Sequence, residues 1–210
     1  MKFPIERPCD CGGYYVFSAY GDADFGSATC SHCGKSAQMI DPLSVSVTAE
    51  RLLYRSKAEL ETGDYSLSIV VAVMAVESYL TRLFLKLKGI DSSLGLRLPT
   101  AAEQEKWEEE YPRKGGFSRP ADFVSQRLVA KTFDNFVAGN PQASALFSRL
   151  RSPSQISPAQ YFQKELFNRR NRIAHWGYVN SGLEEAELCH TIAVALVSIL
   201  REMDRAKYGT

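Results

Sequence analysis

The feature that most constrains the fold is a long segment, residues 64–88, that is apolar on nearly every side. Asp64 precedes it as a candidate N-cap, and Gly89 follows it as a candidate helix stop. The apolar side chains occupy too many positions to form one stripe: Leu67, Ile69, Val70, Val71, Val73, Met74, Val76, Leu80, Leu83 and Phe84. Such a helix must be covered all round, so this segment predicts the centre of a helical bundle.

The remaining sequence supplies helices to cover it. Helical spacing of apolar residues predicts helices over 44–63, 121–137, 158–173 and 183–207, with a short one after Pro141. An insertion at about 89–118 carries a short acidic helix near 100–110. The sequence therefore predicts an all-α helical bundle over 43–210, and a chain of 210 residues can bury such a core without disulfides.

The first forty or so residues differ from the rest. They hold four of the five cysteines, several glycines and short aromatic runs, and Asp41-Pro42 is a natural break. We expect a zinc-ribbon-like module of loops and hairpins over 1–42.

The four cysteines form two close pairs, Cys9-x-Cys11 and Cys30-x-x-Cys33, with eighteen residues between the pairs. Two loops brought together by a hairpin offer the four tetrahedral thiolates that Zn²⁺ favours, and a site filled by protein ligands predicts a structural zinc. The first pair departs from the zinc-ribbon pattern, which usually has two residues between the cysteines. His32 as a replacement ligand, a disulfide pair and unligated thiols are the alternatives.

Charge and hydropathy indicate where in the cell the protein is found and what kind of partner it binds. The longest apolar run, 69–76, ends at Glu77 and is too short to cross a bilayer, and the first residues lack a signal-peptide pattern. We expect a soluble, cytoplasmic protein with no membrane partner. The net charge is only +1, but residues 112–172 carry eleven Lys or Arg against three Asp or Glu, which indicates a phosphate-bearing partner.

The clearest chemistry lies in residues 168–178, Asn-Arg-Arg-Asn-Arg-Ile-Ala-His-Trp-Gly-Tyr. Three arginines in four positions are costly to bury, so we expect them to face a cleft or partner. In a continuous helix, Arg170 and His175 would lie about 140° apart around the axis. We therefore expect the helix to end near Ala174, so that His175 turns back towards Arg170. The alternative is a basic helix end on which His175 caps the last carbonyls.

The pattern Arg170-Asn171-x-x-x-His175 resembles the motif of the HEPN superfamily (higher eukaryotes and prokaryotes nucleotide-binding). Many members are metal-independent endoribonucleases. The resemblance covers about 44–207 in architecture but only this segment in sequence detail, and the N-terminal module lies outside it. A toxin subgroup has Tyr two residues after the His; Gly177 stands there in this chain, so that subgroup's tyrosine modification is not carried over.

The resemblance implies an RNA endonuclease that cleaves by attack of the 2′-OH. His175 would act as acid or base, Arg170 would stabilise the phosphate, and Asn171 would orient the His or bind phosphate. Because the motifs of two subunits usually face each other in this family, a homodimer is implied. Family members often serve as toxins or antiviral effectors, which implies tRNA or mRNA as substrate and an antitoxin or other regulatory protein as partner. Salt-dependent contacts to the RNA backbone, with little sequence readout, are expected from Arg169, Arg172 and Lys164.

Glu77 adds to this prediction, since a carboxylate in so apolar a helix is costly unless it is paired. Arg170 or Arg172 is the obvious partner, with Ser78 and Arg82 as alternatives. We expect Glu77 to fix the catalytic arginine.

A second class of function stays open. The bundle would be a non-catalytic module that binds a nucleotide, RNA or a protein, with the zinc module as adaptor. Cys189 and His190, in the last predicted helix, are expected to be packing residues.

Overall fold

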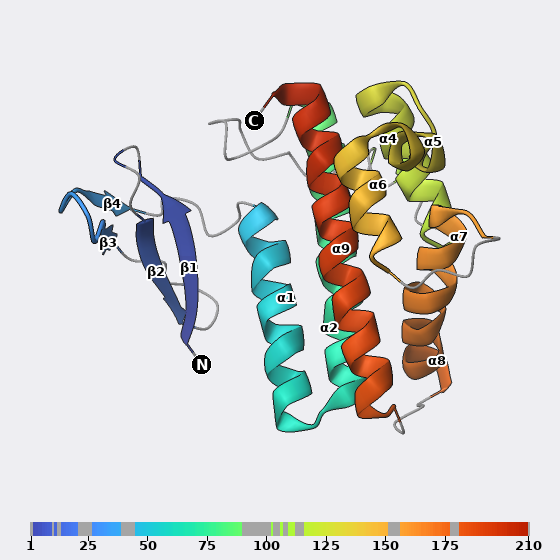
Figure 1. Ribbon diagram of the computed structural model, residues 1–210, viewed down its shortest axis with the longest axis horizontal. Coiled ribbons are helices and arrows are strands. Elements are labelled where there is room, and N and C mark those ends of the chain that lie inside the picture. Colours follow the sequence, from blue (N-terminus) through green and yellow to red (C-terminus); the bar gives the residue numbers. More distant parts are fainter. Residues whose placement is uncertain are drawn as a thin grey trace.

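The computed structural model describes residues 2–9, 11, 14–20, 27–38, 45–89, 102, 106, 109–111, 116–150, 156–176 and 181–209. Figure 1 shows long helices packed side by side, with two small hairpins next to the first helix. The predicted boundary at residues 41–42, most of the predicted 100–110 helix, and Gly177 lie outside the described residues.

The N-terminal strands form two antiparallel hairpins. Strand β1 (Lys2–Pro8) pairs with β2 (Tyr14–Tyr20), and β3 (Ser27–Thr29) pairs with β4 (Ser36–Gln38). The link within each hairpin carries one of the two cysteine pairs.

Helices α1 (Val45–Thr62) and α2 (Tyr65–Leu87) follow as an antiparallel pair (Figure 1). The side chain of Asp64 accepts a hydrogen bond of 3.0 Å from the Leu67 N–H, as expected of an N-cap. Gly89, with a φ of +73°, lies just beyond the end of α2. The predicted bounds of the central helix are confirmed.

Helix α2 is long and apolar enough to cross a membrane, the one helix of that kind in the described part of the chain. However, 67% of its apolar window is buried inside the protein. The core helix of a soluble bundle meets the same criteria, so the structure is compatible with a soluble protein.

The middle of the chain differs from the prediction of one helix over 121–137. Two helices lie there instead, α4 (Ser118–Val129) and α5 (Phe133–Gly139), and the short helix predicted after Pro141 is present as α6 (Pro141–Ser148). Ala130 ends α4 in the left-handed region, with a φ of +55°. Thr132 then caps α5, and the Asp122 carboxylate accepts a hydrogen bond of 2.8 Å from the Phe133 N–H. The single-helix prediction is wrong because two polar side chains satisfy the start of a new helix.

The C-terminal half consists of α7 (Pro158–Phe162), the π-helical turn η2 (Gln163–Phe167), α8 (Asn168–Trp176) and α9 (Leu183–Tyr208). The first three form one continuous rod that starts at a capping box of Ser157 and Gln160. The largest fully buried side chains come from most of these helices: Ile69, Leu80, Leu83, Phe117, Phe133, Phe162, Leu166, Ile192, Leu196, Ile199, Leu200 and Met203. The predicted all-α helical bundle is confirmed for the described residues after 44.

Candidate functional site

Four cysteines converge in the N-terminal module. Their sulfur atoms all lie within 4.8 Å of one another. Two contacts, Cys9 Sγ to Cys33 Sγ and Cys11 Sγ to Cys30 Sγ, measure 3.6 Å. Four sulfurs placed tetrahedrally at about 2.3 Å from Zn²⁺ would be roughly 3.8 Å apart. The cluster can therefore hold a metal ion, and its dimensions are compatible with zinc.

The backbone of the second cysteine loop, residues 30–35, has a conformation suited to holding a metal ion. Gly34 has a φ of +70°, and its N–H donates to the Cys30 carbonyl at 3.0 Å. The His32 N–H donates to the Cys30 sulfur at 3.4 Å. Backbone N–H groups of Cys33 and His32 lower the pKa of Cys30, which favours the thiolate. His32 directs its ring Nδ1 at the Cys11 carbonyl, 3.2 Å away, and is not among the clustered ligands.

Helix α8 carries the arginine-rich segment, and the π-helical turn η2 leads directly into it. A π turn inserts an extra residue into the helical repeat and is frequent at functional sites. Gln163, at the start of this turn, accepts a hydrogen bond of 2.5 Å from the Phe117 N–H and donates one of 2.7 Å to Asn168 Oδ1. The Gln163 side chain thus joins the start of α8 to the start of α4.

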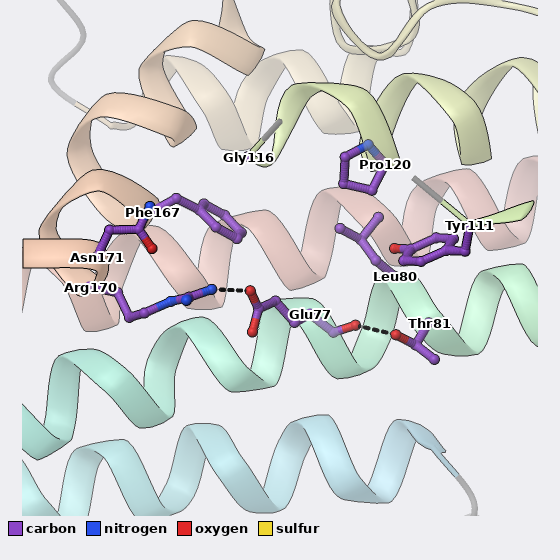
Figure 2. A pocket seen from close by; sticks show the side chains of 9 residues that line it. All are labelled: Glu77, Leu80, Thr81, Tyr111, Gly116, Pro120, Phe167, Arg170 and Asn171. Atoms are coloured by element: carbon purple, nitrogen blue, oxygen red, sulfur yellow. Dashed lines mark hydrogen bonds and ion pairs between the residues drawn. The ribbon is translucent and has the colours of Figure 1, made fainter. Parts of the chain in front are cut away.

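The predicted pairing of Glu77 with Arg170 is present. Arg170 Nη2 donates to Glu77 Oε1 across the gap between α8 and α2 (Figure 2). Desolvation by burial raises the pKa of the Glu77 carboxyl, and the positive charge of Arg170 opposes that rise without cancelling it. The ion pair fixes the guanidinium in place.

A cavity of about 400 Å³ lies against this ion pair (Figure 2). Its lining comes from α2, residues 111 and 116, the start of α4 and the rod that ends in α8: Glu77, Leu80, Thr81, Tyr111, Gly116, Pro120, Phe167, Arg170 and Asn171. This volume is within the range of pockets that bind small ligands. Three of the predicted site residues, Glu77, Arg170 and Asn171, are thus brought together at one cavity.

His175 does not join them. Helix α8 runs on to Trp176, so the expectation that it ends near Ala174 is wrong. Nothing between Asn171 and Trp176 breaks the helix, and Ala174 favours it. His175 is exposed, one turn beyond Asn171 on nearly the same face, and about 140° around the axis from Arg170. The imidazole and the guanidinium of one chain point apart.

The other predicted RNA-contacting residues differ in exposure. Arg169 donates to Glu165 at 2.6 Å and to Glu185 at 2.8 Å, and only 21% of its side chain is exposed. Arg172, with 58% of its side chain exposed, lies 3.4 Å from the same Glu185. Lys164 is 65% exposed and 3.4 Å from Glu165. Arg169 therefore supports the packing of α8 on α9, while Arg172 and Lys164 face solvent.

Sequence reasoning missed Tyr111, Gly116 and Pro120 as cavity residues. They come from the end of the predicted insertion and the start of α4, far along the chain from both Glu77 and Arg170. None of the three has a residue type or spacing that indicates a functional site. The packing of α4 against α2 brings them to the cavity.

The two candidate packing residues of α9 behave as expected. Cys189 is fully buried, and burial raises the pKa of its thiol to about 12. His190 is half-buried, and its Nδ1 lies 3.0 Å from the hydroxyl of Ser56. Desolvation by burial lowers the pKa of His190.

Comparisons of the chain with protein-family models, with curated proteins and with solved structures give no match.

Proposed function

We propose that this protein is a metal-independent RNA endonuclease of the HEPN type. The observation that carries the proposal is the Arg170–Glu77 ion pair: an arginine of the predicted motif is held at a cavity, with Asn171 beside it and an exposed His175 one turn further on. The neighbouring basic segment, with exposed Arg172 and Lys164, adds an attraction for the RNA backbone.

The residues fit the chemistry of transesterification. The ribose 2′-oxygen forms a bond to phosphorus as its proton passes to a base, and the P–O5′ bond breaks as the 5′-oxygen receives a proton. His175 serves as base or acid, because histidine is the side chain most often used for proton transfer in enzymes. Arg170 offers a planar, permanently charged fork to the phosphoryl oxygens. The products are a 2′,3′-cyclic phosphate and a 5′-hydroxyl.

The proposal includes a homodimer, and the geometry of α8 supports it. Since Arg170 and His175 of one chain point apart, a complete site needs the arginine of one chain and the histidine of a second. A two-fold axis near α8 would form two such sites at once.

The N-terminal module has a supporting role in this proposal. We take it as a zinc-ribbon-like unit in which Cys9, Cys11, Cys30 and Cys33 bind a structural zinc ion. The chain would work in the cytoplasm, where thiols stay reduced. A tRNA or mRNA substrate, control by an antitoxin or other protein, and a role as toxin or antiviral effector follow from the HEPN resemblance alone.

The test is RNA cleavage by the purified chain in EDTA, with its bound zinc measured before and after. The proposal expects cleavage of tRNA or total RNA to 2′,3′-cyclic phosphate ends, and its loss in His175→Ala and Arg170→Ala. Arg201→Ala is a matched control, because Arg201 is ion-paired with Glu50 away from the cavity. Cleavage that survives His175→Ala refutes the proposal.

A second candidate is a non-catalytic module that binds a nucleotide, RNA or a protein. The observation in its favour is that the cavity lies on the Arg170 face of α8, away from His175. Binding of RNA without scission, equal in the wild type and in His175→Ala, would support it.

A further inference from the structure

One wall of the cavity is apolar and firmly packed. It is formed by Leu80, Pro120 and Phe167, all of which are buried. The Phe167 ring stacks on Phe117, with ring centroids 5.0 Å apart and an interplanar angle of 30°. A fixed apolar wall next to polar groups suits a planar heterocycle with a polar edge.

Tyr111 and Gly116, two described residues of the predicted insertion at 89–118, also line the cavity. The Tyr111 ring is held by aromatic packing, with its centroid 5.0 Å from that of Phe84 and 6.2 Å from that of Phe123. In Figure 2 the Tyr111 hydroxyl points along the cavity. Tyr111 therefore adds a firmly held polar group to the cavity lining.

The polar side consists of a carboxylate flanked by hydrogen-bond donors. Arg170 donates to Glu77 Oε1, whereas no hydrogen bond to Oε2 is found among the described residues. Desolvation raises the pKa of Glu77 despite the positive charge of Arg170, and 45% of the Glu77 side chain is exposed, so a ligand can reach it. A ligand with N–H donors would complete the hydrogen bonding of this carboxylate.

We propose that this cavity binds a guanine base of single-stranded RNA, with its Watson–Crick edge on Glu77. Guanine is the one common RNA base with two adjacent N–H donors on that edge, and a carboxylate accepts such a pair through charge-assisted hydrogen bonds. The adjoining O6 acceptor then faces the donors of Arg170 and Asn171. The inference rests on the proposed function for the identity of the polymer, and it adds base selectivity to the expected backbone contacts.

Binding to the full-length His175→Ala chain tests this without cleavage. The probes are fluorescent pentanucleotides, UUXUU, in which X is guanine, hypoxanthine or adenine. Hypoxanthine lacks the N2 amino group, so we expect it to bind roughly tenfold more weakly than guanine, and adenine to bind more weakly still. Adding Glu77→Gln should remove the difference between guanine and hypoxanthine. Glu50→Gln, at an ion-paired carboxylate that does not line the cavity, should retain it.

The outcomes separate this inference from the proposed function. Equal affinity for the three probes overturns the guanine inference, even if the wild-type chain cleaves RNA in EDTA. Preference for guanine in a chain that cleaves no RNA supports the inference and refutes the nuclease. If the Glu77→Gln variant does not fold, the difference in affinity between the guanine and hypoxanthine probes decides the question. It is measured on the His175→Ala chain, which retains Glu77.

Discussion

Replacing Gly116 with alanine tests the junction between the insertion, α4 and the rod that ends in α8. An ideal Cβ on Gly116 would lie 2.1 Å from Gln163 Oε1 and 2.6 Å from Gln163 Cδ. The Gln163 side chain is flexible at its end, so it would rotate away rather than displace the backbone. That rotation breaks its hydrogen bonds to the Phe117 N–H and to Asn168.

The expected cost has two parts. Gly116 has a φ of +72°, where alanine costs about 1 kcal/mol relative to glycine. The two lost hydrogen bonds add about 1 kcal/mol each. We expect Gly116→Ala to lower the free energy of unfolding by about 3 kcal/mol, which for a chain of this length is about 9 °C in the unfolding temperature.

Gly89→Ala is the matched control. Gly89 has a φ of +73°, but no atom lies within 4 Å of its ideal Cβ, so only the backbone cost of about 1 kcal/mol applies. Thermal unfolding followed by circular dichroism compares the two variants. A double-mutant cycle with Gln163→Ala should show that the two changes are not additive. Equal unfolding temperatures for Gly116→Ala and Gly89→Ala would refute the role assigned to Gln163.

Three further predictions concern charge and metal. The folded-state pKa of His190 is depressed, so its contribution to stability is complete above its unfolded pKa and is lost as the pH falls through the folded value. His190→Gln should therefore weaken the loss of unfolding temperature between pH 7.5 and pH 5; an unchanged pH dependence would contradict this. Arg169→Ala should destabilise the chain by about 1–3 kcal/mol, because Arg169 is paired with two carboxylates. Arg172→Ala should change the stability by no more than about 0.5 kcal/mol. It should also reduce, by about one unit, the slope of the logarithm of the RNA-binding constant against the logarithm of the salt concentration. If the two variants lose the same stability in urea unfolding and the same salt dependence in RNA titration, the difference in burial between Arg169 and Arg172 has no effect. A chelator that removes the proposed zinc should alter the hairpin module but keep the far-ultraviolet helical signal, because the core comes from the helices; collapse of that signal would contradict independent folding of the bundle.

Local signals in the sequence predicted the features that depend on neighbouring residues. Asp64 and Gly89 mark the ends of α2 because a cap and a left-handed glycine act within a single turn. The pairing of Glu77 with Arg170 was also predictable, since a carboxylate in an apolar helix requires a cation and the motif supplies one.

Features that depend on tertiary packing could not be predicted in this way. The break at Ala130 depends on Asp122, which reaches the Phe133 N–H from the preceding helix. The π turn before α8 coincides with Gln163, whose partner is the Phe117 backbone in another helix. Such contacts join residues of different helices, and the spacing of apolar residues within one helix does not predict them.

The predicted helix end near Ala174 was wrong for a different reason. The prediction required Arg170 and His175 to meet within one chain, and it placed the helix end so that they would. The structure continues α8 to Trp176, so the proposed active site needs the histidine of a second chain.

Subunit complementation tests that claim most directly. Arg170→Ala and His175→Ala chains are each expected to be inactive alone. In a mixed dimer, one of the two sites would combine the intact arginine of one chain with the intact histidine of the other. Random pairing should therefore restore about a quarter of the wild-type cleavage. Mixed dimers that form, as shown by differently tagged subunits, yet remain inactive would contradict a shared site.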